Sequence, residues 1–250
     1  MRKEALDKIA KRYLPPGLEL SKLRKMQTLL ASRVEEVDHV DENVRKICGL
    51  DLAYVNKEGK ELGIACAALY DAHTDKLLEV ACTVTEIKFP YIPTLLSLRE
   101  LRPMILALRK LQEQPELVLV DGHGRAHPYR LGIAAHLGVV TKMPTIGVAK
   151  SLLYGKVICR ENSDVCDIVD EETGEVIGKA IRHYGKFVYV SIGNKITLDT
   201  AVKIVKKLLK TRSQMPLPIL YAHRKCNEIK RSLKMQTSTH KNGNILDFLK

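Results

Sequence analysis

Four consecutive apolar residues at 117–120 constrain the fold of this chain more than any other feature. Pro115 precedes the run, and Asp121-Gly122 follows it directly. A run this short and this apolar is typical of a strand that is buried on both faces, in a sheet covered by helices on each side. The sequence therefore predicts an internal strand that ends at an acidic residue.

The segments around this strand predict the rest of a sheet. Three strand-like runs joined by short polar connections precede it and indicate an antiparallel meander, at 44–54, 63–70 and 77–89. A helix capped by Thr94 is expected at 94–111. Further helices and strands are expected to alternate, at 131–137, 145–148, 165–169, 176–181, 187–192 and 198–210. This order predicts an α/β fold, with a mixed sheet flanked by helices on both faces.

Composition limits the class of protein. The chain has 250 residues, of which 45% are hydrophobic, enough for one core. We expect a single catalytic domain at 1–233 and a flexible polar tail at 234–250. The net charge of +12 favours a polyanionic partner, nucleic acid or an anionic membrane surface. Because the chain shows neither a secretory signal nor an apolar run of about 18 residues, no membrane span is expected, and the cytoplasm is the predicted location.

The cysteines do not suggest a metal site. None of the six forms a C-x-x-C pair, so zinc is not expected. Cys48, Cys66 and Cys82 lie in apolar, strand-like runs. We expect these three to be reduced, buried and packed as small hydrophobic residues.

Three carboxylates are candidates for a metal centre. Asp51 interrupts an apolar strand, where an acidic group is costly to bury unless it is paired or binds a cation. Asp121 ends the buried strand, and carboxyl ends of parallel strands are where such sheets place ligands. Glu100 lies on the helix expected at 94–111, which precedes the buried strand. Oxygen ligands of this kind suit Mg²⁺ and resemble a ribonuclease H-like site. The alternative is that these are turn or cap residues placed by chance.

Two loops and a lysine add to this centre. Gly122 and Gly124 let the backbone approach a flat ligand, and His127 lies close behind them in the same loop. Pro90-Tyr91-Ile92-Pro93 predicts a stiff apolar projection that can enter a base stack, or else a turn with Tyr91 in the core. Lys150, just after a buried strand, is expected to contact phosphate or to be an ordinary solvated lysine.

Together these stretches resemble the Endonuclease V family. The resemblance covers roughly residues 18 to 230 and is densest from 89 to 151. The matching motifs occur in the family's order, at 49–54, 89–100, 121–128, 132–138, 144–151 and 216–223.

The resemblance implies a role for each matching residue. It implies metal ligands, namely Asp51, Asp121 and Glu100. It implies further catalytic residues, namely His127, Lys150 and His223. It implies a DNA wedge at Pro90, Tyr91, Ile92 and Pro93, a base pocket at Leu96, Gly122 and Gly124, and phosphate contacts at Arg99 and Lys150.

The family's activity is implied in the same way. We expect an endonuclease that depends on Mg²⁺, with Mn²⁺ as a substitute, and that recognises deoxyinosine in DNA. The family cuts the second phosphodiester bond 3′ to the lesion and leaves 3′-hydroxyl and 5′-phosphate ends. The alternatives are a ribonuclease acting on inosine in RNA, and a nucleic-acid-binding repair factor that does not cleave.

Four positions depart from the family pattern. Thr94 replaces a usual Gly, and Tyr129 separates Pro128 from an Arg that usually follows it directly. The segment ending at Asn194 replaces Ser-Pro-Gly-His, and Ile219-Leu220 replaces Thr-Arg. These changes are expected to affect base selectivity and phosphate contacts, and they leave the choice between DNA and RNA open.

The last residues contain one more pattern. Ile245, Phe248 and Leu249 have the spacing of a peptide that docks on a replication sliding clamp, although Asn242 stands where that motif has Gln. The alternative is a tail that packs on its own domain.

Overall fold

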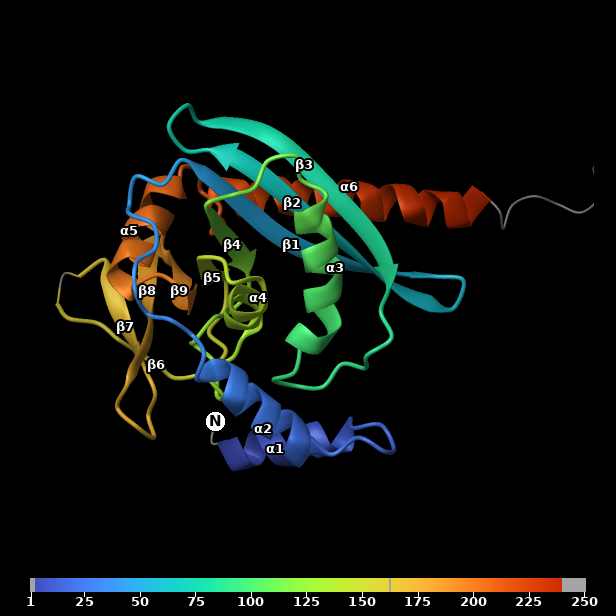
Figure 1. Cartoon of the computed structure of the whole chain (residues 1–250), viewed down its shortest axis with the longest axis horizontal. Helices are drawn as coiled ribbons and strands as arrows, with labels where there is room; N and C mark the ends of the chain where they lie inside the picture. Colours follow the sequence, from blue (N-terminus) through green and yellow to red (C-terminus); the bar gives the residue numbers. More distant parts are fainter. Residues whose placement is uncertain (1–2, 162, 240–250) are drawn as a thin grey trace, which may run out of the picture.

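A computed structural model describes residues 3–161 and 163–239 of the chain. The strands form one nine-stranded sheet in the order β3-β2-β1-β4-β5-β9-β8-β7-β6 (Figure 1). Their bounds are β1 (Lys46–Lys57), β2 (Lys60–Asp71), β3 (Lys76–Glu86), β4 (Leu117–Asp121), β5 (Thr145–Ala149), β6 (Lys156–Ile158), β7 (Val165–Val169), β8 (Val176–His183) and β9 (Lys186–Asn194). The helices are α1 (Lys3–Arg12), α2 (Leu20–Ala31), α3 (Ser97–Arg109), α4 (Ile133–Thr141), α5 (Leu198–Leu208) and α6 (Leu217–Thr239).

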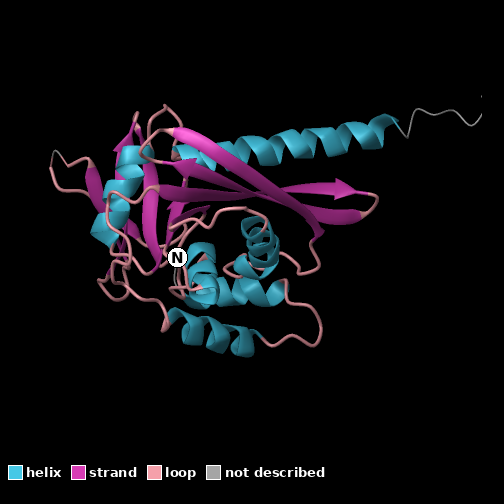
Figure 2. Ribbon diagram, turned by 45° about the horizontal axis from the view of Figure 1, so that its top comes forward, coloured by secondary structure: helices cyan, strands magenta, loops and turns pink. Residues whose placement is uncertain are grey.

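The centre of the sheet is parallel and its flanks are antiparallel. Strand β4 pairs in parallel with both β1 and β5, whereas β1–β3 form the predicted antiparallel meander. The four apolar residues of β4 are fully buried, as predicted. Side chains of α3 and α4 pack on one face of the central strands, and those of α5 and α6 pack on the other (Figure 2). The mixed sheet with helices on both faces is therefore confirmed.

The N-terminal helices lie against the loop between β3 and α3. Ala10 of α1 and Leu20 of α2 form a small core with Ile92 and Leu95 of that loop. This core is separate from the two main layers, so the first two helices support the loop rather than the sheet.

Several boundaries differ from those expected. Helix α3 begins at Ser97 rather than after a Thr94 cap, because Thr94 has φ +68° and its hydroxyl donates to the carbonyl of Pro93. Strand β6 was not predicted, since its three residues are too few to show a pattern. Helix α6 continues through Thr239, past the expected boundary at 233. The rest of the predicted tail, with Ile245, Phe248 and Leu249, lies outside the described residues.

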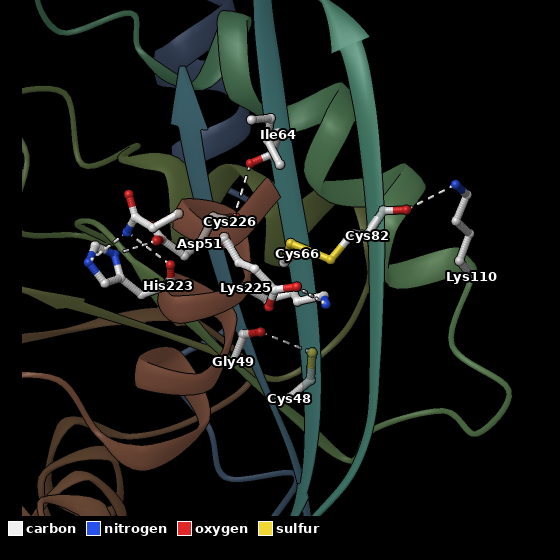
Figure 3. Close-up of a disulfide and its surroundings, with 12 residues drawn as sticks. Cys48, Gly49, Asp51, Ile64, Cys66, Cys82, Lys110, His223, Lys225 and Cys226 are labelled. Carbon is white, nitrogen blue, oxygen red and sulfur yellow. Dashed lines mark hydrogen bonds and ion pairs between the residues drawn. A yellow bond between two sulfur atoms is a disulfide. The ribbon is translucent and has the colours of Figure 1, made fainter. Parts of the chain in front are cut away.

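Two disulfides correct the expectation for the cysteines. Cys66 and Cys82 are directly opposite each other on β2 and β3 and are joined (Figure 3), and Cys159 is joined to Cys166. The expectation of reduced Cys66 and Cys82 is therefore wrong, because hydrophobic patterning does not reveal which residues face each other across two strands. Cys48 is a free, buried cysteine, as expected.

Within residues 3–161 and 163–239, no helix combines the length and apolar character that crossing a bilayer requires.

Candidate active site

The parallel pairing of β1 and β4 brings two carboxylates together. The register pairs Leu50 with Val120, so Asp51 and Asp121 are the next residue on each strand. Asp51 is buried and Asp121 is half-buried. Apolar residues on both strands fix this register, which places the two acids side by side where the parallel pairing of β1 and β4 ends.

Helix α6 adds a histidine to this pair. His223 Nδ1 lies 2.8 Å from Asp51 Oδ2 (Figure 3), and one ligand atom from each of Asp51, Asp121 and His223 falls within 4.8 Å of the others. The amide of Asn227 donates to His223 Nε2 over 3.1 Å. Because an amide nitrogen cannot accept, Nε2 is the acceptor and Nδ1–H donates to Asp51.

A close approach of backbones holds α6 in this position. A Cβ on Gly49 of β1 would lie 2.1 Å from the carbonyl carbon of Pro218. Only glycine leaves room for α6 to begin against β1 at this point. The helix then places His223 over Asp51, one turn after Pro218.

Lys150 contacts the second carboxylate. It follows the end of β5, next to β4, and its Nζ lies 3.2 Å from Asp121 Oδ2. Its side chain is 41% exposed, so it can reach both the carboxylate and a ligand at the surface. The structure therefore brings together Asp51, Asp121, Lys150 and His223, as the resemblance implied.

Glu100 lies beside this cluster, but it is not one of the three residues whose ligand atoms lie within 4.8 Å of one another. It is buried on α3, and its Oε1 accepts a hydrogen bond from the Tyr54 hydroxyl over 2.8 Å. Burial, together with the charges of Asp51 and Asp121, raises the pKa of Glu100 to about 7. Burial and Asp51 also raise the pKa of Asp121.

These carboxylates suit a hard divalent cation. Their mutual repulsion raises the cost of ionisation, and Lys150 and His223 offset it only in part. A bound cation would remove that cost, and its preferred ligands are oxygen atoms of this kind. His223 is engaged with Asp51, so the oxygens of Asp51 and Asp121 are the ligands offered, with Glu100 beside them.

The wedge loop has one exposed and one buried residue. Tyr91 is 57% exposed, so it projects from the protein instead of packing in the core. Ile92 is fully buried against α1 and α2 and does not project, which corrects its assignment to the exposed wedge. Pro90 and Pro93 are half-buried on either side.

His127 anchors this loop and does not join the carboxylates. Its Nε2 donates to the carbonyl of Thr94 over 3.1 Å, and its Nδ1 accepts from the backbone N–H of Tyr129. Burial lowers the pKa of His127 to about 3, so the ring stays neutral at physiological pH. With both nitrogens engaged, His127 positions the wedge loop, and its expected catalytic role stays a prediction.

Arg99 is also structural. Its guanidinium is buried and donates to Glu61 and to the carbonyl of Phe89, each over 2.7 Å. It also lies over the ring of Tyr54, 5.1 Å from the centroid. Because these internal partners engage the guanidinium, the structure does not support the expected phosphate contact of Arg99, which stays a prediction.

In the loop that contains Gly122 and Gly124, the backbone N–H groups of both glycines bond within the protein. The N–H of Gly122 donates to the Val148 carbonyl, and the N–H of Gly124 donates to the Ser191 hydroxyl. Both N–H groups therefore already have partners within the protein. Gly124 is buried, and a Cβ there would meet the Ile192 carbonyl oxygen at 1.9 Å. Of the three residues assigned to the base pocket, Leu96 is the exposed one, at 37%.

Three of the four departures from the family pattern are internal. Asn194 is buried, accepts from the Glu35 N–H and donates to the Gly138 carbonyl. Leu220 packs against the main core, and the Tyr129 hydroxyl donates to Asp7. These three residues have partners within the protein, and their expected effect on selectivity stays a prediction. Thr94 remains the one departure in the wedge loop.

Sequence reasoning missed the residues that support the site. Tyr54 orients Glu100, and Asn227 fixes the tautomer of His223. Gln27 of α2 donates to the Thr94 carbonyl over 2.9 Å. Only Asn227 had a sequence signal, since it lies one helical turn after His223 and so on the same face.

Replacing Thr94 by glycine should make the protein more stable. A β-branched residue at φ +68° is strained by about 1 to 2 kcal/mol, and glycine loses part of this gain through the greater entropy of its unfolded chain. We expect urea denaturation to show a net gain of about 0.5 to 1 kcal/mol. Thr94→Ala, which keeps a Cβ, should gain less. A glycine variant less stable than the parent would contradict this account.

Carboxylates side by side on two parallel strands, on a sheet covered by helices, are an arrangement typical of nucleases that bind a divalent cation. The Endonuclease V family profile matches residues 28–224. Endonuclease V from Thermofilum pendens is 40% identical over 212 residues, which span 84% of this chain and 88% of that protein. Endonuclease V from Gloeobacter violaceus is 37% identical over 198 residues, 76% of this chain and 78% of that protein. The chain belongs to the Endonuclease V family.

Solved structures of Endonuclease V proteins have the same fold as this chain. Endonuclease V from Bacillus subtilis superposes with a TM-score of 0.82 at 28% identity and covers 88% of this chain and 96% of that one. Ciona intestinalis Endonuclease V, in complex with a 24mer DNA containing an inosine followed by a ribo-adenosine, gives a TM-score of 0.77 at 27% identity. Its match covers 86% of this chain and 98% of that one. These likenesses confirm the predicted ribonuclease H-like fold.

Proposed function

We propose that this protein hydrolyses the second phosphodiester bond 3′ to deoxyinosine in DNA and leaves 3′-hydroxyl and 5′-phosphate ends. The observation that carries this proposal is the pair Asp51 and Asp121 at one sheet edge, with Lys150 and His223 in direct contact with them. The family relationship and the inosine-containing DNA bound by the Ciona relative support the choice of substrate.

Asp51 and Asp121 would hold a divalent cation, with Glu100 beside them, and we propose Mg²⁺ with Mn²⁺ as a substitute. When bound, such a cation polarises a phosphate and lowers the pKa of water at the site. The oxygen-rich donor set supports a hard cation of this kind.

The neighbouring side chains have separate tasks. Lys150 holds Asp121 and presents a positive charge where the phosphate gains negative charge during cleavage. His223 keeps Asp51 oriented through its Nδ1–H, and Asn227 keeps the imidazole in that tautomer. The exposed edge of this cluster is where the scissile phosphate would lie.

The wedge loop would select the base. Tyr91 projects far enough to fill the vacancy that a base leaves when it rotates out of the stack. Hypoxanthine differs from adenine by a carbonyl in place of the amino group, and from guanine by the absence of the 2-amino group. A tight pocket beside Leu96 would accept hypoxanthine and exclude guanine by its extra group.

Matched DNA and RNA oligonucleotides test the substrate. Each carries one inosine in the same sequence, and each is incubated with wild-type protein and Mg²⁺. Faster nicking of the DNA supports the proposal. Faster cutting of the RNA would favour the ribonuclease alternative, and binding of both without any cut would favour a repair factor that does not cleave.

Tyr91→Ala should lower the rate of inosine cleavage by about tenfold or more, because an unfilled vacancy costs a few kcal/mol of restacking. The side chain is mostly exposed, so the melting temperature should not change. The matched control is Tyr13→Ala, which removes another tyrosine that is 53% exposed and should leave cleavage intact. Equal cleavage by Tyr91→Ala and wild type would rule out a wedge at this position.

Cation affinity should rise with pH up to about 7. Below that value Glu100 holds a proton, because its pKa is raised from 4.5 to about 7, and a cation must compete with this proton. The shift corresponds to about 3 kcal/mol in the free energy of unfolding. This stabilisation is fully present below pH 4.5, and the metal-free protein loses it as the pH rises through 7. Mn²⁺ titrations by calorimetry at pH 6 and pH 8 should show up to about tenfold tighter binding at pH 8. Glu100→Gln should flatten this dependence, and an unchanged dependence would exclude Glu100 as its source.

A further inference from the structure

Helix α6 continues away from the active site with a basic face. His223, which contacts Asp51, is the first residue of an open groove along this helix. The groove is lined by His223, Arg224, Asn227, Lys230, Arg231 and Lys234. No carboxylate is among these lining residues.

The opposite side of α6 attaches it to the sheet. Ala222 and Cys226 are fully buried against β1 and β2, and Ile229 and Leu233 pack on the same cluster. Spacings of three and four residues place these four on one side of the helix and the basic groove on another. The packing of α6 therefore fixes the direction in which the basic residues point.

Three of the groove's basic residues are not paired with a carboxylate within the described part of the protein. Among the residues that the structure describes, Arg224, Lys230 and Arg231 make no ion pair, and the acidic Glu228 of the same helix pairs with Lys225. Positive charges gathered on one side of a helix without partner carboxylates repel one another and lower its stability. A polyanion in the groove would relieve this repulsion.

The wedge loop and α6 lie on opposite sides of the sheet, with the carboxylates between them. The loop packs on α1 and α2, on the side of α3, whereas α6 covers the other face (Figures 1 and 2). A strand that passes from the wedge to the carboxylates therefore continues toward α6. Because the proposed cut lies 3′ to the lesion, the part that reaches α6 is 3′ to the cut.

We propose that the basic groove of α6 binds the phosphate backbone of the DNA arm on the 3′ side of the cut. From His223 to Lys234 the helix rises roughly 16 Å, the axial length of about five nucleotides of one strand. The contact is independent of base sequence, because phosphates carry no base identity. This inference rests on the proposed function for its direction along the strand.

Arg224→Gln/Lys230→Gln/Arg231→Gln tests the groove. In an Asp121→Asn background that cannot cut, we measure binding by anisotropy to inosine duplexes with a 3′ arm of about 20 or about 4 base pairs. The triple variant should bind the long-arm duplex about tenfold more weakly or worse, and its salt slope should fall by about 2 to 3. Binding to the short-arm duplex should not change.

The control removes the same charge elsewhere. Lys203→Gln/Lys206→Gln/Lys207→Gln changes three lysines of α5, which packs on β8 and β9. This variant should keep the dependence on the 3′ arm. Equal losses in both triples, or a groove variant that binds like the parent, would overturn the proposal. A dependence on the 5′ arm instead would overturn its direction.

Two further measurements distinguish a failure of the groove proposal from a failure of the proposed function. Arg231→Gln alone changes one exposed residue, should melt like the parent, and should lower the salt slope by about 1. Ordinary duplex DNA without inosine should show the same loss of slope. If wild-type protein never cuts inosine DNA but these slopes still fall, the proposed function fails while the groove stands. If cutting occurs and the slopes are unchanged, only the groove fails.

Discussion

Asp121→Asn is expected to lower the rate of inosine cleavage by about a thousandfold or more. The substitution removes one of the two carboxylates at the sheet edge and leaves Lys150 without its partner, while the shape of the side chain is kept. Binding to an inosine duplex should persist, because the substitution leaves the wedge loop and the basic groove of α6 unchanged. The measurement is single-turnover cleavage beside a binding titration on the same oligonucleotide.

The stability of this variant distinguishes lost chemistry from lost folding. Burial and the charge of Asp51 disfavour the ionised form of Asp121, so neutral Asn should leave the metal-free protein at least as stable as wild type. Asp199→Asn, at an exposed acid on α5, is the matched control and should cut normally. An Asp121→Asn protein that melts like wild type and still cuts at a wild-type rate would exclude Asp121 from the centre.

Gly49→Ala should damage both stability and activity, although residue 49 contributes no side chain to the site. The new methyl group would lie 2.1 to 2.3 Å from backbone atoms of Pro218 and Ile219, which cannot rotate away. We expect a loss of about 3 kcal/mol in the free energy of unfolding. We also expect at least about a tenfold loss of cleavage, because α6 must move and carries His223 away from Asp51.

Gly174→Ala is the matched control for this second prediction. It introduces the same methyl group at a turn with open space around it, so only the strain of φ +72° remains, about 1 kcal/mol. Cleavage should not change. If Gly49→Ala retains full activity and stability, the close approach of β1 and α6 is not what positions His223.

Sequence predicted the parts of this site that follow from strand patterning. The buried run at 117–120 placed Asp121 at a strand end, and the apolar run around Asp51 placed that residue within a strand of the meander. These predictions hold because hydrophobic periodicity fixes where each strand lies along the chain. Parallel pairing of β1 and β4 then brings the two acids side by side.

The sequence does not reveal which side chains are already bound by partners elsewhere in the fold. Arg99 and His127 looked available for substrate, yet Glu61 and Thr94 engage them inside the protein. The Cys66–Cys82 disulfide depends on cross-strand register in the same way. A residue type shows what a side chain can bind, but only the fold shows whether a nearer partner already binds it.

We propose that the centre formed by Asp51 and Asp121 cuts DNA beside inosine when a divalent cation is present. The most direct test incubates the wild-type protein with a duplex carrying one inosine, with Mg²⁺ or with a chelator, and maps the product ends by mass spectrometry. The account predicts one nick, at the second phosphodiester bond 3′ to the inosine, only with Mg²⁺. Protein that binds this duplex and never nicks it, or that nicks it equally well with the chelator, would contradict the account.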